Sequence, residues 1–247
     1  SGTGRSHKKF SDLFLGFIAG AECLDDMARL GVDSGFLSVC DSHIYTPKTY
    51  GDFLRSFDMR QVRDLQGFLM DQAFEFRRQI HPGENNFIFD MDSTPNPQYG
   101  KKMEGVKTNY NGVECLDTQN VYDQFGFQYF IEVREGTAKS ADDSEQVIHK
   151  LMKVFNAHKS RHNPKATCTF RGDRGYYKSR FVNACFAKNA DFVLGVVQHP
   201  DTFPKIIGQI HNWTSVDVED PERIKFYDGR DCEIGTTRFR PDTFQRS

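Results

Sequence analysis

The sequence lacks several features that mark particular classes of protein. It has one tryptophan among 247 residues, and its six cysteines form no C-x-x-C pair, so the usual structural zinc spacings are excluded. No run of about 18 apolar residues occurs, so neither a membrane-spanning helix nor a membrane partner is expected. The formal net charge of −2 gives no general attraction to nucleic acid. These absences, together with the lack of a signal peptide, favour a soluble cytoplasmic protein with reduced cysteines.

The composition that is present suits a folded protein with a sizeable core. Hydrophobic residues make up 38% and charged residues 27% of the chain, which is ordinary for a globular protein. Phenylalanine occurs 23 times, and we interpret it as core. Positive charge is concentrated between residues 159 and 180, where basic residues far outnumber the single acid, Asp173. Such a segment could contact a phosphate backbone, or it could form a basic face that is simply solvated.

The apolar patterns predict a helical region followed by a mixed α/β region. Helical spacing predicts three helices, over residues 10–30, 46–57 and 59–80. From residue 86 the period changes to that of strands, expected at 87–92, 113–123 and 127–135. An alternation of helix and strand follows, expected at 141–158, 166–173, 175–189 and 191–197. Beyond residue 200 we expect short antiparallel strands.

The stretch Phe87–Thr94, "FIFDMDST", places two acids at the end of a predicted strand. Side chains alternate along a strand, so Asp90 and Asp92 point to the same face. Taken alone, this D-x-D-x-T pattern resembles the first motif of haloacid-dehalogenase phosphatases, with Asp90 as nucleophile and Asp92 as acid/base. That fold needs a helix and parallel strands after the motif, whereas a meander of strands follows here.

The meander is typical of an RNase H-like fold instead. In that order, three antiparallel strands are followed by helix, strand, helix and strand. The fourth strand would end at Asp173, and because the first and fourth strands are neighbours in such a sheet, Asp92 and Asp173 would converge. Carboxylates are the ligands that Mg²⁺ prefers. Two such ions can activate a nucleophile and stabilise the leaving oxygen of a phosphodiester.

Longer motifs resemble a known family. The stretches "FIFDMDSTPNPQYGKKMEG", "VREGTAKSADDSEQ", "TFRGDRGYY" and "NADFVLGV" resemble the catalytic domain of bacterial insertion-sequence transposases of the DDE class. The resemblance covers roughly residues 8 to 200, including the helical region before the strands. It implies an enzyme that cleaves DNA at the ends of an insertion sequence and transfers the freed strand to target DNA. It also implies Mg²⁺, with Mn²⁺ as a substitute, and a homodimer on the paired DNA ends.

The resemblance assigns roles to individual residues. Asp92 and Asp173 match the first and second metal-binding acids, and Asp90 supports the metal or trades roles with Asp92. Arg134, in the turn "REGT", contacts DNA or braces the acidic site. Contacts with DNA phosphates are expected from the basic residues of these motifs, Arg171, Arg174, Lys178 and Lys139, whose alternative interpretation is solubilising surface.

The third metal ligand of the resembling family is a glutamate on a helix after a β-rich insertion. Glu219, Glu222 and Glu233 have no helical context, so this acid is expected beyond residue 247 and the chain is interpreted as a fragment. A catalytically dead DNA-binding remnant is the alternative from a non-enzyme class. The expected organisation is an N-terminal helical region, an RNase H-like catalytic core and the start of a β-rich insertion, over residues 1–85, 86–200 and 201–247.

Overall fold

A computed structural model describes residues 2–40, 43–99, 103–196, 200–201, 203–216 and 232–237. The chain divides into two compact units, Ser1–Gly67 and Phe68–Ser247. The division falls within helix α5 (Met59–Ile80), while the boundary expected at residue 85 stays a prediction. None of the helices in the described ranges combines the length and the apolarity that crossing a bilayer requires.

The first unit is helical, as predicted. It contains α1 (Gly2–Ile18), α2 (Asp26–Leu30), α3 (Ser34–Val39), α4 (Pro47–Arg55) and the start of α5. Its core is small and includes Leu13, Met27, Tyr50 and Phe53. The Tyr50 hydroxyl donates a hydrogen bond of 3.0 Å to the buried Asp12 carboxylate, which satisfies both groups away from water.

The single helix predicted over residues 10–30 is wrong. Helix α1 ends at Ile18, and Gly20 adopts a left-handed backbone with φ of +90°. The Gly20 amide donates to the Phe17 carbonyl and the Ala21 amide to the Gly16 carbonyl, which is the Schellman arrangement that closes a helix. The apolar period continued through this turn, so periodicity alone did not reveal the break.

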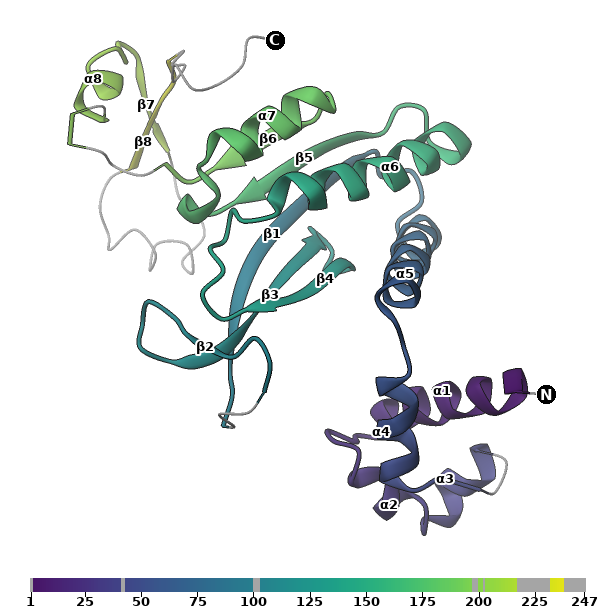
Figure 1. The fold of residues 1–247 in the computed structure, drawn as a ribbon. Coiled ribbons are helices and arrows are strands. Elements are labelled where there is room, and N and C mark those ends of the chain that lie inside the picture. The colour runs from purple at the N-terminus through teal and green to yellow at the C-terminus, as the bar shows by residue number, and fades with distance from the viewer. Residues whose placement is uncertain are drawn as a thin grey trace. The chain divides into compact units, whose positions relative to one another are not determined.

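The second unit is built on a mixed six-stranded sheet. Its strands are β1 (Asn86–Pro97), β2 (Lys107–Thr108), β3 (Glu114–Asp123), β4 (Gln128–Glu135), β5 (Thr167–Gly172) and β6 (Asp191–Leu194). The order is β2-β3-β1-β5-β6, and β4 also pairs with β3 (Figure 1). Strand β1 is antiparallel to β3 but parallel to β5, and β6 is parallel to β5. This is the predicted RNase H-like order, and the phosphatase alternative is not supported because the strand after the D-x-D motif returns antiparallel.

Helices and short elements complete the second unit. Helix α6 (Ser144–His162) forms where expected, but the helix predicted over 175–189 is split. A 3₁₀ turn η1 (Arg174–Tyr176) comes first, and α7 (Ser179–Ala187) starts after Lys178, whose φ of −137° and ψ of 145° are extended. Beyond these lie α8 (Phe203–Ile207) and the antiparallel pair β7 (Trp213–Val216) and β8 (Cys232–Gly235). Any of the predicted short strands that fall on residues 217–231 or 238–247 lie outside the described residues, and the β-rich insertion stays a prediction.

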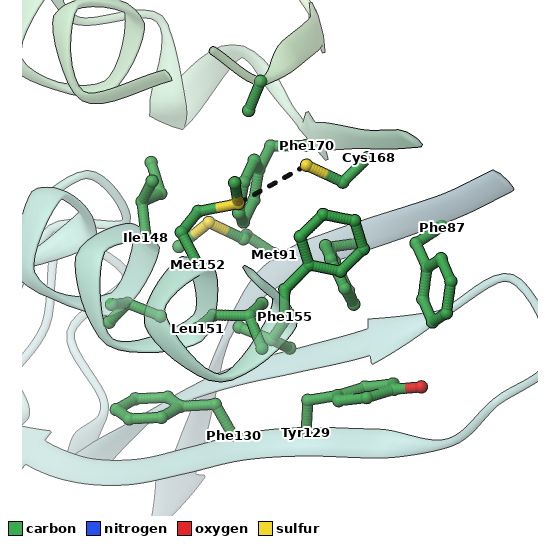
Figure 2. Packing of buried hydrophobic residues seen from close by; sticks show 14 of the residues in the cluster. Phe87, Met91, Tyr129, Phe130, Ile148, Leu151, Met152, Phe155, Cys168 and Phe170 are labelled. Atoms are coloured by element: carbon green, nitrogen blue, oxygen red, sulfur yellow. Dashed lines mark hydrogen bonds between the residues drawn. The ribbon is translucent and has the colours of Figure 1, made fainter. Parts of the chain in front are cut away.

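The main core lies between one face of the sheet and the helices that cover it. Alternate residues of β1, Phe87, Phe89 and Met91, are at most 3% exposed, because a period of two sends them all to one face. Figure 2 shows how Phe155 of α6 and Phe170 of β5 pack among them. Each fully buried side chain of this size contributes roughly 1.5–3 kcal/mol. The interpretation of phenylalanine as core is confirmed for this cluster, whereas seven other phenylalanines among the described residues are exposed, including Phe14 and Phe17 of α1.

Strand β1 is longer than predicted, because it continues through the stretch "STPNP" that the sequence suggested was a turn. Pairing with β5 stops at Met91, so beyond that residue β1 has β3 as its one neighbour among the described strands. Pro95 and Pro97 lie two residues apart, and the Gln98 amide donates to the Glu114 carbonyl of β3. Odd-numbered amides of this stretch therefore point to the open edge, where proline removes no ladder hydrogen bond.

Candidate active site

Asp92 and Asp173 each come one residue after the last pair formed by the parallel strands β1 and β5. The register of β1 with β5 ends at Met91 opposite Gly172, so the next step brings Asp92 opposite Asp173. Adjacent strands lie about 4.8 Å apart. Both side chains are exposed and belong to the face opposite the core, because Met91 is buried and Asp173 continues the extended backbone with φ of −71° and ψ of −176°.

Asp173 is held by the turn that follows it. Its Oδ1 accepts a 2.8 Å hydrogen bond from the Gly175 amide, which caps η1 and leaves Oδ2 without a hydrogen-bond partner among the described residues. Two glycines allow the chain to pack closely around this turn. A Cβ on Gly172 would lie 3.0 Å from the Tyr176 ring, and one on Gly195 would lie 2.8 Å from the Arg174 amide nitrogen. The position of Asp173 is therefore set by backbone contacts on both sides.

Substituting Gly195 with alanine tests this arrangement. The added methyl would press on the backbone of Arg174, so something in the turn must shift, at a cost of about 1–3 kcal/mol. Gly67→Ala in α5 is the matched control, because nothing lies within 4 Å of its Cβ and alanine favours a helix by up to about 1 kcal/mol. Denaturant unfolding of both variants should show changes of opposite sign, and equal changes would contradict the close packing at Gly195.

The Asp90 carboxylate forms an ion pair with an arginine. Arg171 Nη2 donates to Asp90 Oδ2 at 2.6 Å, and Arg171 Nε contacts the other carboxylate oxygen, so the pair is bidentate. The two side chains are 31% and 54% exposed, in the order Asp90 and Arg171. The hydrogen bond to Asp90 raises the pKa of Arg171 above its ordinary value. The contact shows that Arg171 and Asp90 share the face that carries Asp92 and Asp173.

Arg134 lies in a buried network, which does not favour the expectation that it contacts DNA directly. Its side chain is 6% exposed and pairs with the Asp117 side chain, also 6% exposed, through a 2.8 Å hydrogen bond from Nε. Further donations run to the Asp142 carbonyl and to Ser93, the residue after Asp92, and Ser93 itself donates to Asp117. Of the two roles that the resemblance implied for Arg134, bracing the acidic site is the one that its contacts support.

The network also contains residues that sequence reasoning missed. Gln119 is fully buried and accepts a hydrogen bond from Arg134, while its amide nitrogen and the Tyr176 hydroxyl have no geometrically sound partner among the described residues. Burial raises the pKa of Tyr176, with smaller contributions from Asp92 and Asp173, so the phenol stays neutral beside the two acids. A signal existed: Asp117 and Gln119 share the face of the apolar Val121, which is unusual for polar side chains in a strand.

Three of the predicted phosphate contacts are exposed. Lys139, Arg174 and Lys178 lie in the loops that surround Asp173, and their side chains have no ion-pair partner among the described residues. Arg174 directly follows Asp173, and Lys139 and Lys178 line the same cavity as Gly175. Arg171, by contrast, is bound to Asp90 in this structure.

A complete set of metal ligands is not present in the described part of the chain. No group of three or more His, Cys, Asp or Glu side chains that could hold a metal occurs there. Of the glutamates considered for the third position, Glu219 and Glu222 lie outside the described residues, and Glu233 is described by its backbone alone, in β8. The position of a third acid stays a prediction.

Comparison with solved structures finds transposases, at low similarity. A pre-cleavage Mos1 transpososome has 13% identity over 69% of this chain and 56% of that chain, with a TM-score of 0.31. The catalytic domain of Mos1 mariner transposase has 11% identity over 70% of this chain and 81% of that one, with a TM-score of 0.30. Because the identities and TM-scores are this low, the fold assignment depends on the strand order and not on these structures. No curated protein matches the sequence.

The family comparison covers most of the chain. Residues 5–222 match the family described as transposase DDE domain group 1. The match includes most of the first unit, the six-stranded sheet, Asp92 within β1 and Asp173 directly after β5. On this evidence the chain belongs to the transposase DDE domain family, group 1.

Proposed function

We propose that the chain cleaves DNA at the ends of a mobile element and joins the freed 3′-hydroxyl to target DNA, in a reaction that depends on a divalent metal. The observation that carries this proposal is the register of β1 with β5, because it makes neighbours of Asp92 and Asp173, which are far apart in sequence. Membership of the DDE transposase family supports it. Since the chain spans 56% of the first transposase structure's chain, the activity of a complete protein is part of the proposal.

The chemistry of these residues fits a hard divalent cation. The Asp92 side chain is exposed and has no hydrogen-bond partner among the described residues, and the Asp173 carboxylate keeps one oxygen free of such contacts. Both groups are anionic oxygen donors, which Mg²⁺ and Mn²⁺ prefer. A bound metal would polarise the phosphodiester and lower the pKa of an attacking water. Asp92 and Asp173 would hold it, and Asp90 would assist only after release from Arg171.

The surrounding residues would position the DNA. Arg174, Lys178 and Lys139 are exposed cations beside Asp173, where they can bind backbone phosphates without reading sequence. The pair of Arg134 and Asp117 would keep β1 straight beyond Met91 by holding Ser93. We further propose that two copies act together, because a mobile element has two ends.

Nicking of supercoiled plasmid DNA tests the proposal without knowledge of the recognised end sequence. We expect the full chain to produce open circles in Mg²⁺ or Mn²⁺, and none when the metal is chelated. Binding measured in parallel by gel shift separates the alternatives. DNA binding with no nicking in either metal would contradict the enzyme and favour the catalytically dead remnant.

A further inference from the structure

Asn120 of β3 lies directly opposite Asp92 of β1 in the antiparallel register of the two strands. Side chains of opposed residues stand on the same face of a sheet, with Cβ atoms about 4.5–5.5 Å apart. The residues on either side of Asn120, Gln119 and Val121, are fully buried on the core face. Asn120 therefore belongs to the opposite face, which carries the proposed metal site.

The Asn120 side chain is 7% exposed, although Asp92 beside it is exposed. Two contacts hold its amide group in one orientation. Nδ2 donates a 3.2 Å hydrogen bond to the Thr118 carbonyl, and Oδ1 accepts a 3.0 Å hydrogen bond from Gln128 Nε2 of β4. Because a backbone carbonyl can only accept, the atom beside Thr118 must be the nitrogen.

The same contacts direct the amide nitrogen toward β1. The Gln98 amide donates to the Glu114 carbonyl, so this pair of residues belongs to the hydrogen-bonded pairs of β1 and β3. Such pairs recur at every second position of an antiparallel ladder, and Thr118 occupies one of them. The Thr118 carbonyl therefore points to β1, and the nitrogen that binds it lies on that side, while the amide oxygen faces β4. The nitrogen carries a second hydrogen that has no acceptor among the described residues.

We propose that Asn120 is a positioning residue for Asp92. In the proposed state, one carboxylate oxygen of Asp92 accepts the second amide hydrogen of Asn120, and the other oxygen is left for the divalent cation. A hydrogen bond to a charged carboxylate is stronger than one between neutral groups, so it would fix the orientation of Asp92. This inference rests on the proposed function, because it gives Asn120 a role only beside a metal site.

Binding of Mn²⁺ alone, measured from the electron paramagnetic resonance signal of the free ion, tests this role without DNA. The part of the binding that Asp92→Asn abolishes is assigned to the site. Asn120→Leu nearly keeps the size of the side chain and removes the donor, and we expect it to weaken that binding about tenfold, because groups that orient metal ligands contribute on this scale. The same substitution added to Asp92→Asn should cause no further loss, because the two residues act as one unit.

Plasmid nicking at increasing Mn²⁺ concentration separates positioning from a general structural effect. For Asn120→Leu we expect the half-saturating Mn²⁺ concentration to rise about tenfold. The rate at saturating Mn²⁺ should stay unchanged, because excess cation fills the site without help from Asn120. A loss of folded protein would instead lower the rate at every Mn²⁺ concentration.

Thr118→Val is the matched control. Thr118 is the next buried polar residue on the same face of β3, at 8% exposure, and its hydroxyl contacts Asn96. Valine keeps the backbone carbonyl that binds Asn120, so the Mn²⁺ affinity should not change. Equal Mn²⁺ affinity in Asn120→Leu and the unmodified chain, or an equal loss in Thr118→Val, would overturn the proposal.

The two measurements also separate this proposal from the proposed function. Nicking by the unmodified chain, together with unchanged Mn²⁺ affinity in Asn120→Leu, would leave the proposed function standing and reject the role of Asn120. The expected pattern of Mn²⁺ binding without nicking would reject the proposed catalysis and support the role of Asn120.

Discussion

Replacing Asp173 with asparagine is expected to lower the plasmid-nicking rate at least about 1,000-fold, which corresponds to roughly 4 kcal/mol of transition-state stabilisation. Asparagine keeps the size and can still accept the Gly175 hydrogen bond, but it removes the negative charge that a divalent cation requires. Asp92→Asn should behave in the same way, because the register makes the two residues neighbours.

Asp90→Asn provides the matched control for this pair of variants. Since Asp90 is already bound by Arg171, we expect the Asp90→Asn variant to nick plasmid DNA less than about tenfold more slowly than the unmodified chain, a loss of roughly 1.4 kcal/mol. Initial rates of open-circle formation, with far-ultraviolet circular dichroism to check folding, provide the comparison. A loss at Asp90 as large as that at Asp92 would show that Asp90 holds the metal and that its pairing with Arg171 does not persist during cleavage.

Replacing Arg134 with methionine is expected to lower the free energy of unfolding by about 3–5 kcal/mol. The substitution leaves Asp117 charged and buried, at 6% exposure, without its partner. It also releases Ser93 and Gln119, so nicking should fall about tenfold, or roughly 1.4 kcal/mol, even where the variant is folded. Denaturant unfolding and plasmid nicking measure the two effects.

A double variant separates charge from packing at this position. Arg134→Met combined with Asp117→Leu removes both charges and should recover most of the lost stability, because buried ion pairs are often replaceable by apolar side chains. Arg161→Met, at an exposed position near the end of α6, should change the free energy of unfolding by less than about 0.5 kcal/mol. No recovery in the double variant would contradict the buried-charge explanation.

Much of the fold was predictable because it follows from the spacing of apolar residues along each helix and strand. The alternation in "FIFDMD" and the change from helical to strand spacing near residue 86 predicted β1 and the sheet order, and this order made neighbours of Asp92 and Asp173. Errors occurred where one backbone conformation interrupted a continuing pattern, as at Gly20 and Lys178. The proline stretch was misinterpreted because the open edge that tolerates Pro95 exists only once the sheet is assembled.

The site was less predictable than the fold, since its side-chain pairs are distant in sequence. Arg171 and Asp90 are 81 residues apart and Arg134 and Asp117 are 17 apart, so no local motif indicated either pair. Both arginines lie in motifs that suggested contact with DNA. Their charge was evident from the sequence, but their partners required the pairing of four strands, β1 with β5 and β3 with β4.

Cleavage of the protein backbone by Fe²⁺ bound in place of Mg²⁺, with ascorbate and peroxide, tests the central claim without DNA. If Asp92 and Asp173 form one metal site, fragments should arise from cuts near both residues, and Asp173→Asn should abolish both sets together. Cuts near one residue alone, or cuts near residue 92 that persist in Asp173→Asn, would show that the two carboxylates do not share a metal.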